Sequence, residues 1–360
     1  MSQSSPAGAP APPEQRTNVT LSRGFAGWLE TMQCALAFTS YQTGQLFLIG
    51  LTPDRQTSIH QANFTRAMGV TVAGQRIVLA SDTAIWRLEN ILEPGQVANL
   101  IYDRMYMPRA ASYTGDLDIH ELAVRADGQI VFVNTKFSCL ATLSPTHSFK
   151  PLWKPSFISK LAPEDRCHLN GLAMQDGRAR YVSCVSRSDA IGGWRNRRWE
   201  GGVVIDVAED KVVVDGLSMP HSPRVHAGAL WVLEAGRGFL VRIDAQTGTR
   251  EDIAFCPGFL RGLSFVGGYA LVTTSLPRDG LFKDLPLQDN LEARDTDPRC
   301  AIYVIDLRTG GIAEWIELDG QITELFDITV IPGCRCPSSV LLNSPNMASL
   351  ITIEGETQVA

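Results

Sequence analysis

Three of the chain's six histidines, His120, His168 and His221, stand beside other polar residues at the starts of similar apolar segments. A neutral imidazole can act as a general base or as a metal ligand. Arg261, at a corresponding place, supplies a permanent positive charge for an anionic group of a substrate. Two chemistries are therefore open: proton abstraction by an imidazole beside an arginine, or a divalent metal held by imidazoles and a carboxylate. No HExxH, paired CxxC or contiguous ligand set supports the metal, so we rank it second.

The elements that must bring these residues together are repeated β-strands. Short runs rich in β-branched and aromatic residues alternate with Gly, Asp and Pro turns, and helical periodicity is nearly absent outside residues 24–32. One unit recurs, in which an apolar strand is followed by a Gly-containing turn and further strands. Its copies start at residues 68, 120, 170, 221, 261 and 326, which lie 40 to 65 residues apart. Four-stranded repeats of this length are typical of β-propeller blades.

We therefore predict an all-β fold, a single β-propeller with four-stranded antiparallel blades. Residues 35–64 resemble strands two to four of a blade, and residues 328–331, 340–343 and 350–353 resemble strands one to three. Seven blades result if residues 18–22 help to complete the closure, whereas six result if the two ends of the chain share one blade. We favour seven. A β-sandwich or a pair of β domains fits the regular repeats poorly.

Composition suggests the domain boundaries. Residues 1–18 are small, polar and proline-rich, which predicts a disordered tail and not a secretory signal. Residues 19–360 are predicted to form the propeller, with the polar segment 276–300 as an inserted loop. Because no signal is found, we expect a cytoplasmic protein whose eight cysteines are mostly reduced and act as apolar fillers.

The charge balance restricts the partners. The formal net charge is −6, from 32 Lys and Arg against 38 Asp and Glu, which argues against a nucleic-acid partner. No apolar run approaches the roughly 18 residues of a membrane-spanning helix, so we expect no membrane partner. We expect a small-molecule or peptide ligand at the mouth of the central channel, with a protein partner as a second option.

Equivalent positions at the starts of the innermost strands form a ring at one mouth of a propeller. The first ring is Met68, His120, Asn170, His221, Arg261 and Phe326. A second ring lies two residues earlier and points the same way, because side chains alternate along a strand; it is Arg66, Asp118, His168, Met219, Phe259 and Glu324.

These rings supply the candidate site residues. The catalytic candidates are His120, His168, His221, Asp118, Asn170 and Arg261. The substrate-binding candidates are Arg66, Glu234 and Glu324, of which Glu234 ends a second strand near the same rim. The alternative is that polar residues at the rim only satisfy strand-end amides and channel water.

Several strings also resemble a known family. They include Tyr113-Thr-Gly-Asp-Leu-Asp-Ile-His120, Ala162-Pro-Glu-Asp-Arg-Cys-His-Leu-Asn-Gly-Leu-Ala173 and Glu324-Leu-Phe-Asp-Ile-Thr-Val330. Residues from about Trp28 to Gly333 resemble an uncharacterised bacterial family of conserved hypothetical proteins, a numbered family of unknown function with β-propeller-like repeats. The resemblance implies a single-domain propeller and assigns no activity, cofactor or catalytic residue.

Two function classes follow from the residues. The first is a lyase- or hydrolase-type enzyme with a histidine general base, an arginine that holds an anion and a divalent metal as an option, acting on a small or peptidic substrate. The second is a non-catalytic protein-binding module or assembly scaffold, because fold alone does not imply function. The sequence leaves open whether the protein is an enzyme, and it identifies no cofactor beyond that optional metal.

Overall fold

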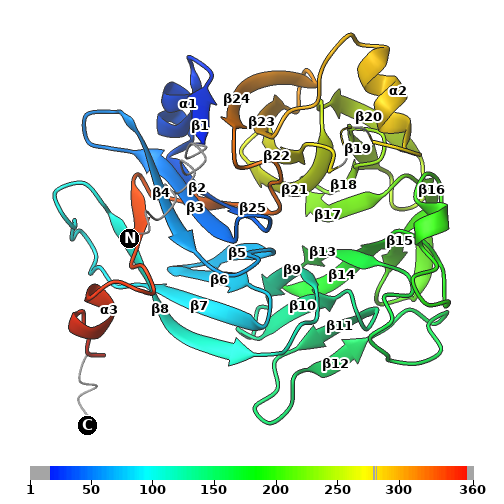
Figure 1. Cartoon of the computed structure of the whole chain (residues 1–360), viewed down its shortest axis with the longest axis horizontal. Helices are drawn as coiled ribbons and strands as arrows, with labels where there is room; N and C mark the ends of the chain where they lie inside the picture. Colours follow the sequence, from blue (N-terminus) through cyan, green and yellow to red (C-terminus); the bar gives the residue numbers. More distant parts are fainter. Residues whose placement is uncertain (1–16, 279, 281, 355–360) are drawn as a thin grey trace, which may run out of the picture.

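The computed structural model describes residues 17–278, 280 and 282–354, and these form six β-sheets arranged as the blades of a propeller around a central channel (Figure 1). The predicted all-β propeller is confirmed, but the favoured count of seven blades is wrong, and six, the alternative, is correct. Almost all of the predicted tail, residues 1–16, lies outside the described residues.

The first three blades follow one another along the chain, each with its strands numbered from the channel outward. Blade 1 consists of β5 (Val70–Ala73), β6 (Arg76–Ala80), β7 (Ala84–Asn90) and β8 (Arg104–Tyr113). Blade 2 consists of β9 (Ile119–Val124), β10 (Ile130–Asn134), β11 (Cys139–Thr142) and β12 (Lys150–Trp153). Blade 3 consists of β13 (Leu169–Gln175), β14 (Arg178–Cys184), β15 (Gly202–Asp206) and β16 (Lys211–Leu217).

The next two blades repeat this order. Blade 4 consists of β17 (Pro220–His226), β18 (Ala229–Glu234), β19 (Phe239–Ile243) and β20 (Arg250–Phe255). Blade 5 consists of β21 (Phe259–Val266), β22 (Tyr269–Ser275), β23 (Ala301–Asp306) and β24 (Gly311–Asp319). Strand β1 (Asn18–Leu21) adds to the outer edge of blade 5 by pairing with β24.

Blade 6 closes the ring with strands from both ends of the chain. Its inner strand is β25 (Ile328–Pro332), and its other strands are β2 (Cys34–Ser40), β3 (Gln45–Leu51) and β4 (Thr57–Asn63). β25 pairs with β2 in antiparallel register from Cys34 opposite Pro332 to Phe38 opposite Ile328. Such pairing joins the two chain ends without a seam in the ring.

The seventh blade fails because the terminal segments pair elsewhere. Residues 18–22, expected to help the closure, supply β1 on blade 5. Residues 340–343 and 350–353 contain no strand, and β26 (Pro337–Ser339) pairs in parallel with β8 on blade 1. β25 is thus the one part of the final repeat that completes a blade among the described residues.

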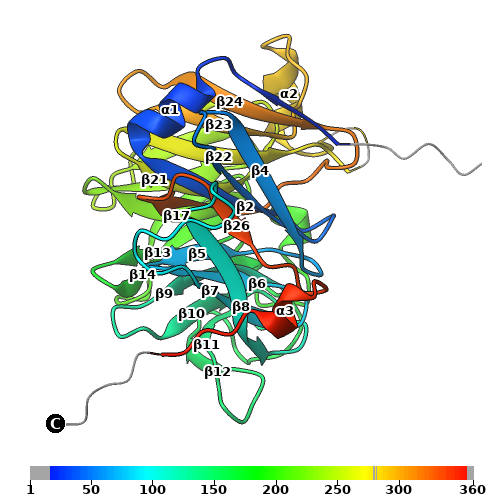
Figure 2. The same ribbon diagram turned by 90° about the vertical axis from the view of Figure 1, so that its left-hand side faces the viewer.

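Within the described residues, three α-helices lie outside the blades. α1 (Phe25–Met32) precedes β2, α2 (Pro286–Glu292) lies in the segment between β22 and β23, and α3 (Asn346–Ser349) follows β26. Figure 2 places α1 and α2 on opposite faces of the ring. α2 lies against the β18–β19 turn, because Leu287 N donates to Gly236 O at 2.8 Å and Asn290 Nδ2 donates to Arg237 O at 3.0 Å.

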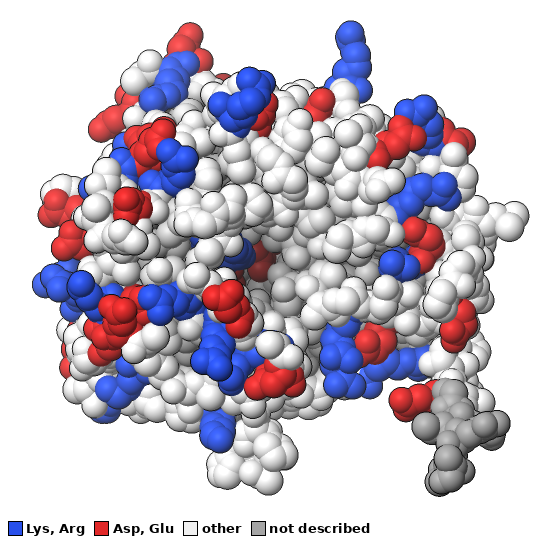
Figure 3. Space-filling model, turned by 180° about the vertical axis from the view of Figure 1, so that it is seen from behind, with Lys and Arg blue, Asp and Glu red and all other residues white. Residues whose placement is uncertain are grey.

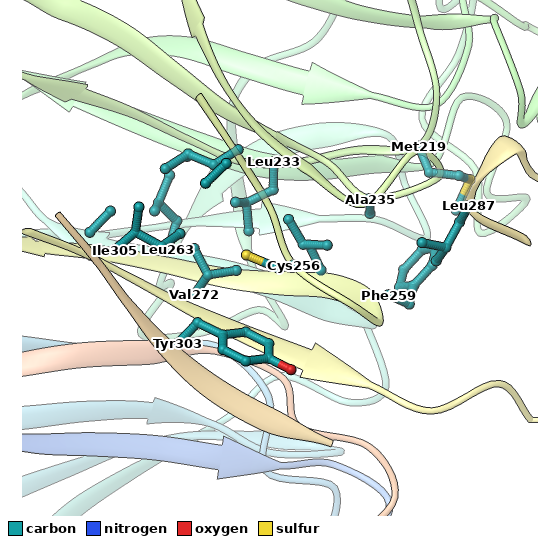
Figure 4. Packing of buried hydrophobic residues seen from close by; sticks show 14 of the residues in the cluster. Met219, Leu233, Ala235, Cys256, Phe259, Leu263, Val272, Leu287, Tyr303 and Ile305 are labelled. Carbon is teal, nitrogen blue, oxygen red and sulfur yellow. The ribbon is translucent and has the colours of Figure 1, made fainter. Parts of the chain in front are cut away.

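The core lies between neighbouring blades, because each blade buries both of its faces. The cluster between blades 4 and 5 includes Leu233, Leu263 and Ile305, and it extends to Met219, Phe259 and Leu287 (Figure 4). Leu287 of α2 therefore belongs to the same cluster as Met219, which precedes β17, and Phe259, which begins β21. All eight cysteines are free and buried, in agreement with a role as apolar fillers. Within the described residues, no helix has the length and apolar character needed to cross a membrane.

The closure predicts the effect of shortening the chain. A chain ended after residue 324 lacks β25, whose Ile328 and Ile331 are buried, and exposes the edge of β2. We expect it to lose the cooperative thermal unfolding transition of the full chain, as measured by circular dichroism. A chain ended after residue 345 keeps β25 and β26 and is expected to retain that transition. Equal melting of the two shortened chains would contradict the six-blade closure.

Candidate functional site

The residues that lead into the inner strands share an unusual backbone conformation. Arg66, Asp118, His168 and Met219 have φ angles of 49°, 54°, 51° and 47°. Left-handed residues other than glycine are uncommon, yet here they recur at one position in four blades. The conformation is therefore a feature of the turn through which the chain enters each of these blades. It sets the direction of the side chains that follow the turn.

Two imidazoles use the carbonyl groups that this turn presents. His120 Nδ1 lies 2.9 Å from the backbone O of Asp118, and His221 Nδ1 lies 2.9 Å from the backbone O of Met219. A carbonyl oxygen only accepts hydrogen bonds, so Nδ1 carries the proton in both rings. Thr135 Oγ1 also lies 2.9 Å from His120 Nδ1, and it donates its own proton to Leu169 O. The lone pair of each neutral ring is therefore on Nε2.

His168 is held by a carboxylate and an indole ring. Its Nδ1 lies 3.1 Å from both carboxylate oxygens of Asp165, so Nδ1 donates here as well. Trp194 donates from Nε1 to Asp165 Oδ2 at 2.7 Å, and its ring stacks on the imidazole with centroids 4.1 Å apart. An imidazole oriented by a carboxylate in this way is the arrangement that enzymes use to activate a general base.

The three imidazoles gather at one mouth, as the two rings of the sequence pattern predict. His120 and His168 lie with ring centroids 4.9 Å apart, and Phe326 packs 5.4 Å from His120. His221 is joined to this group through Arg261, whose Nη1 lies 3.4 Å from His221 Nε2. The Nε2 atoms of His120 and His168 have no hydrogen-bond partner among the described residues, and they are not among the fully buried unpaired atoms. A ligand or water can reach them.

Arg261 is a largely buried guanidinium, with 12% of its side chain exposed, and its partners are weak. Its Nη2 lies 4.0 Å from Glu324, and its Nε has no hydrogen-bond partner among the described residues. Aromatic rings surround it, with Phe259, Phe326 and Tyr41 centred 4.7, 5.5 and 5.8 Å from Cζ. Cation–π contacts hold the guanidinium in place without neutralising it.

Glu324 does not neutralise Arg261, because other groups occupy its oxygens. Tyr41 donates its hydroxyl to Glu324 Oε2, and Arg278 Nε lies 3.0 Å from the same oxygen. Arg278 comes from the segment between β22 and β23 and is largely exposed. The carboxylate thus forms part of the wall of the mouth while Arg261 keeps hydrogen-bonding capacity for a ligand.

Burial sets the protonation of these groups. It lowers the pKa of His120 to about 4 and that of His221 well below its ordinary value, the latter helped by the charge of Arg261. Burial also lowers the pKa of Arg261, although Glu324 and Asp118 oppose this. For Asp118, burial favours the neutral form, but the two nearby imidazoles, Arg66 and Lys136 outweigh it and hold the pKa below its ordinary value. At neutral pH His120 and His221 are therefore neutral and lie beside a cation.

The remaining sequence candidates divide into two groups. Arg66 lies at the mouth, where its Nη2 is 3.1 Å from Asp118 Oδ1. Asn170 is buried; its Oδ1 accepts from Ser183 Oγ at 2.8 Å and its Nδ2 has no partner among the described residues. Glu234 instead serves the local turn, because its carboxylate accepts from Ser218 N at 3.0 Å and from Arg237 at 2.8 Å.

A buried group of charges lies deeper in the channel. Glu121 of β9 and Asp327, just before β25, both face Arg224 of β17. Arg224 forms an ion pair with Glu121 Oε1, although that oxygen is not aligned for a hydrogen bond. Glu121 also accepts from Leu172 N at 2.7 Å, and Asp327 accepts from Val70 N at 2.9 Å. These contacts link inner strands of blades 1, 2, 3 and 4 to the closing blade.

Two buried carboxylates share the single guanidinium in this group. Burial raises the pKa of Glu121 to about 8 and that of Asp327 to about 6, although Arg224 opposes both shifts.

Figure 3, which shows the face turned away in Figure 1, has a hollow at its centre in which acidic and basic atoms are visible.

Two further features bear on ligand binding. No group of three or more His, Cys, Asp and Glu side chains within residues 17–278, 280 and 282–354 is arranged to hold a metal ion. A groove of about 1540 Å³ lies between blades 3 and 4, away from the histidines. Its lining carries charges of both signs, including the pairs Arg180 with Asp206 and Arg242 with Glu251, so it presents no single charge to a ligand.

Comparison with known proteins now identifies the family. The sequence profile described as "Domain of unknown function (DUF4915)" matches residues 23–340. The chain belongs to this family. The search of curated proteins gave no match. Among solved structures, a chain of the "Crystal structure of Nidogen/Laminin Complex" is similar, with a TM-score of 0.52 and 12% identity over 83% of this chain and 99% of that one. This likeness concerns the fold alone.

Sequence reasoning missed several residues at the mouth of this DUF4915 member. Phe259 and Phe326 stand in the predicted rings, but nothing in the pattern marks them as walls around Arg261. Asp165 lies three residues before His168, and this spacing is the one signal that points to it. Trp194 and Tyr41 come from the β14–β15 and β2–β3 loops, whose paths no repeat pattern specifies.

The hydrogen bonds predict the tautomers of the three imidazoles. We expect long-range nitrogen–proton NMR spectra at pH 7 to show Nδ1 protonated and Nε2 unprotonated in His120 and His221, and Nδ1 protonated in His168. In Asp165→Ala, His168 loses its acceptor, so its two tautomers should mix while His120 and His221 stay unchanged. An unchanged His168 spectrum in that variant would contradict the assigned role of Asp165.

The channel charges predict a pH-dependent loss of stability. In Arg224→Met, Glu121 and Asp327 lose their counter-ion, which we expect to lower the free energy of unfolding by about 3 kcal/mol. Both acids bind a proton more tightly in the folded chain than in the unfolded chain, so each favours folding at low pH and loses this contribution as the pH rises through its folded pKa. The loss in Arg224→Met should therefore be larger at pH 8 than at pH 5, as measured by urea unfolding.

The matched control is Arg55→Met, which breaks an exposed ion pair with Glu30. It should change the free energy of unfolding by no more than about 0.5 kcal/mol at either pH. A loss in Arg224→Met that is equal at pH 5 and pH 8 would show that the two carboxylates do not depend on Arg224.

Proposed function

We propose that the mouth of the channel binds a small organic carboxylate and that the protein is a lyase- or hydrolase-type enzyme with His168 as its general base. The observation that carries the proposal is the state of Arg261. A buried guanidinium ordinarily has a close carboxylate partner, because an unpaired buried charge is costly. Arg261 has instead a distant Glu324, an unpartnered Nε and a ring of aromatic side chains. A ligand carboxylate completes its hydrogen bonds.

The charge balance of the mouth favours a carboxylate as the anionic group of the ligand. Glu324 and Asp118 both act on the pKa of Arg261, so both lie near it. A singly charged carboxylate therefore meets less repulsion from Asp118 and Glu324 than a doubly charged phosphate does. A carboxylate carries one charge and matches the planar fork of arginine.

His168 is the best base of the three imidazoles. Asp165 fixes its Nδ1 proton and so leaves the lone pair of the neutral ring on Nε2. Trp194 stacks on the ring and prevents it from turning. With a carboxylate held by Arg261, Nε2 of His168 can take a proton from a neighbouring carbon, whose C–H electron pair forms a C=C bond as a leaving group departs from the next carbon with its bonding pair. In a hydrolysis, Nε2 instead takes a proton from water, whose oxygen attacks a carbonyl carbon and displaces the leaving group there.

A metal-assisted reaction is the less favoured chemistry. The three imidazoles offer Nε2 lone pairs that suit a divalent transition metal. Arg261 places a positive charge within 3.4 Å of His221 Nε2, however, and this charge repels a cation.

A non-catalytic protein-binding module is the second candidate. It draws on Ile191 and Trp199 of the β14–β15 loop, which are 74% and 54% exposed and belong to the same loop as Trp194. The solved chain to which the fold is similar comes from the "Crystal structure of Nidogen/Laminin Complex". A partner bound by this loop would not need Arg261.

The test is a ligand-observed NMR screen of small carboxylates against the purified full chain at pH 7. We expect at least one to bind, and binding to fall at least about tenfold in Arg261→Gln, since a charged hydrogen bond contributes about 1.5–3 kcal/mol. The control is Arg242→Gln, the same change on the exposed Arg242–Glu251 pair, which should leave binding unchanged. Conversion of a bound carboxylate during the experiment should disappear in His168→Asn while the melting temperature is kept.

Two results would count against the proposal. Carboxylate binding that survives Arg261→Gln would place the ligand elsewhere. The absence of any carboxylate binding, together with binding of a protein that is lost in Trp199→Ser, would support the protein-binding module.

A further inference from the structure

The mouth offers a hydrogen-bond acceptor directly beside its cation. His221 Nε2 and Arg261 Nη1 are 3.4 Å apart, which is long for a hydrogen bond. His221 Nδ1 is committed to Met219 O, and burial keeps the ring neutral, so Nε2 has only its lone pair to offer. A ligand that binds here therefore meets a donor for an anion and an acceptor for a proton side by side.

Neither half of this pair is well satisfied within the described residues. Arg261 Nη2 reaches Glu324 Oε2 only at 4.0 Å, and Arg261 Nη1 reaches His221 Nε2 only at 3.4 Å. The Nε2 atoms of His120 and His168 are further acceptors that face the same mouth. The site thus lacks a partner that both accepts and donates hydrogen bonds.

From these donors and acceptors of the mouth we infer that the ligand is a 2-hydroxycarboxylate, with its carboxylate on Arg261 and its neighbouring hydroxyl donating to His221 Nε2. Groups on adjacent carbons present an acceptor oxygen and a donor O–H next to each other, as the pair requires. The inference rests on the proposed function, whose carboxylate site it specifies.

A hydroxyl fits the acceptor better than an ammonium group. Both can donate to Nε2, but an ammonium group would lie within a few ångströms of the Arg261 guanidinium. The two carboxylates that could offset this repulsion are already engaged, Glu324 by Tyr41 and Arg278 and Asp118 by Arg66. Aromatic walls at Phe259 and Phe326 strengthen the repulsion, because they exclude water from between the charges.

The experiment compares ligands that differ only at the second carbon. Lactate, propionate and alanine carry a hydroxyl, a hydrogen and an ammonium group there, and malate, succinate and aspartate form the same series with a second carboxylate. Dissociation constants for the full chain at pH 7 are measured by calorimetry or ligand-observed NMR. We expect the hydroxy acid to bind at least about tenfold more tightly than the unsubstituted acid in whichever series binds, because a site that hydrogen-bonds a hydroxyl discriminates against the analogue lacking it. The amino acid should bind no better than the unsubstituted acid.

A variant assigns the discrimination to His221. His221→Leu removes the acceptor and should reduce the preference for lactate over propionate to about onefold while propionate binding is kept. Because this ring is buried, folding of the variant is checked by its melting temperature. His221→Gln, which keeps an acceptor oxygen, serves as the second variant and should keep part of the preference.

The outcomes separate this inference from the proposed function. If propionate and lactate bind equally to the unmodified chain and both are lost in Arg261→Gln, the 2-hydroxycarboxylate assignment is wrong and the carboxylate site stands. If alanine binds best, the ligand is an amino acid and the assignment is also wrong. If neither series binds, nor any other carboxylate of the screen, the proposed function itself fails. Tighter binding of inorganic phosphate than of every carboxylate would overturn both.

Discussion

The pairing of β25 with β2 is the interaction on which the rest of the structure depends. It joins residues about 300 positions apart and converts an open row of blades into a ring. Glu324, Phe326 and Asp327 all lie within a few residues of β25, so this pairing carries them to the channel. Without it, Arg261 would lose part of its aromatic surroundings, and Arg224 would lose one of its two carboxylates.

Ring closure also reduces the solvent contact of the polar groups at the strand starts. Six strand starts meet at one mouth, and their side chains exclude water from one another. The consequence differs with depth. In the channel, two acids and one arginine bind the inner strands together, and burial holds the acids toward their neutral forms. At the mouth, burial keeps His120 and His221 neutral and leaves Arg261 as a cation without a close partner. Burial thus has two outcomes. The charged group in the channel holds the inner strands together, whereas the group at the mouth remains able to bind a ligand.

The sequence predicted this site to the extent that the repeat determines it. Strand starts recur in register, so the repeat pattern alone places His120, Asn170, His221 and Arg261 on one ring. Blade number could not be obtained the same way, because strand-like residues 340–343 carry no information on which strand they pair with. The surroundings of Glu234 could not be predicted either: it ends a second strand, and the turn that follows folds Arg237 back onto it. Trp194 and Tyr41 lie in loops, where no periodicity fixes the direction of a side chain.

The left-handed residues explain why two histidines from different blades, His120 and His221, present similar chemistry. Asp118 and Met219 have the same backbone conformation, and each turns its carbonyl toward the imidazole two residues later. The tautomer of His120 and His221 is therefore a product of the blade repeat and needs no special partner. His168 stands two positions earlier in the pattern, at the left-handed residue itself, and has no such carbonyl. Asp165 and Trp194 supply the missing anchor. Of the three rings, His168 is thus the one whose orientation depends on side chains alone, and a side-chain carboxylate is what makes an imidazole a stronger base.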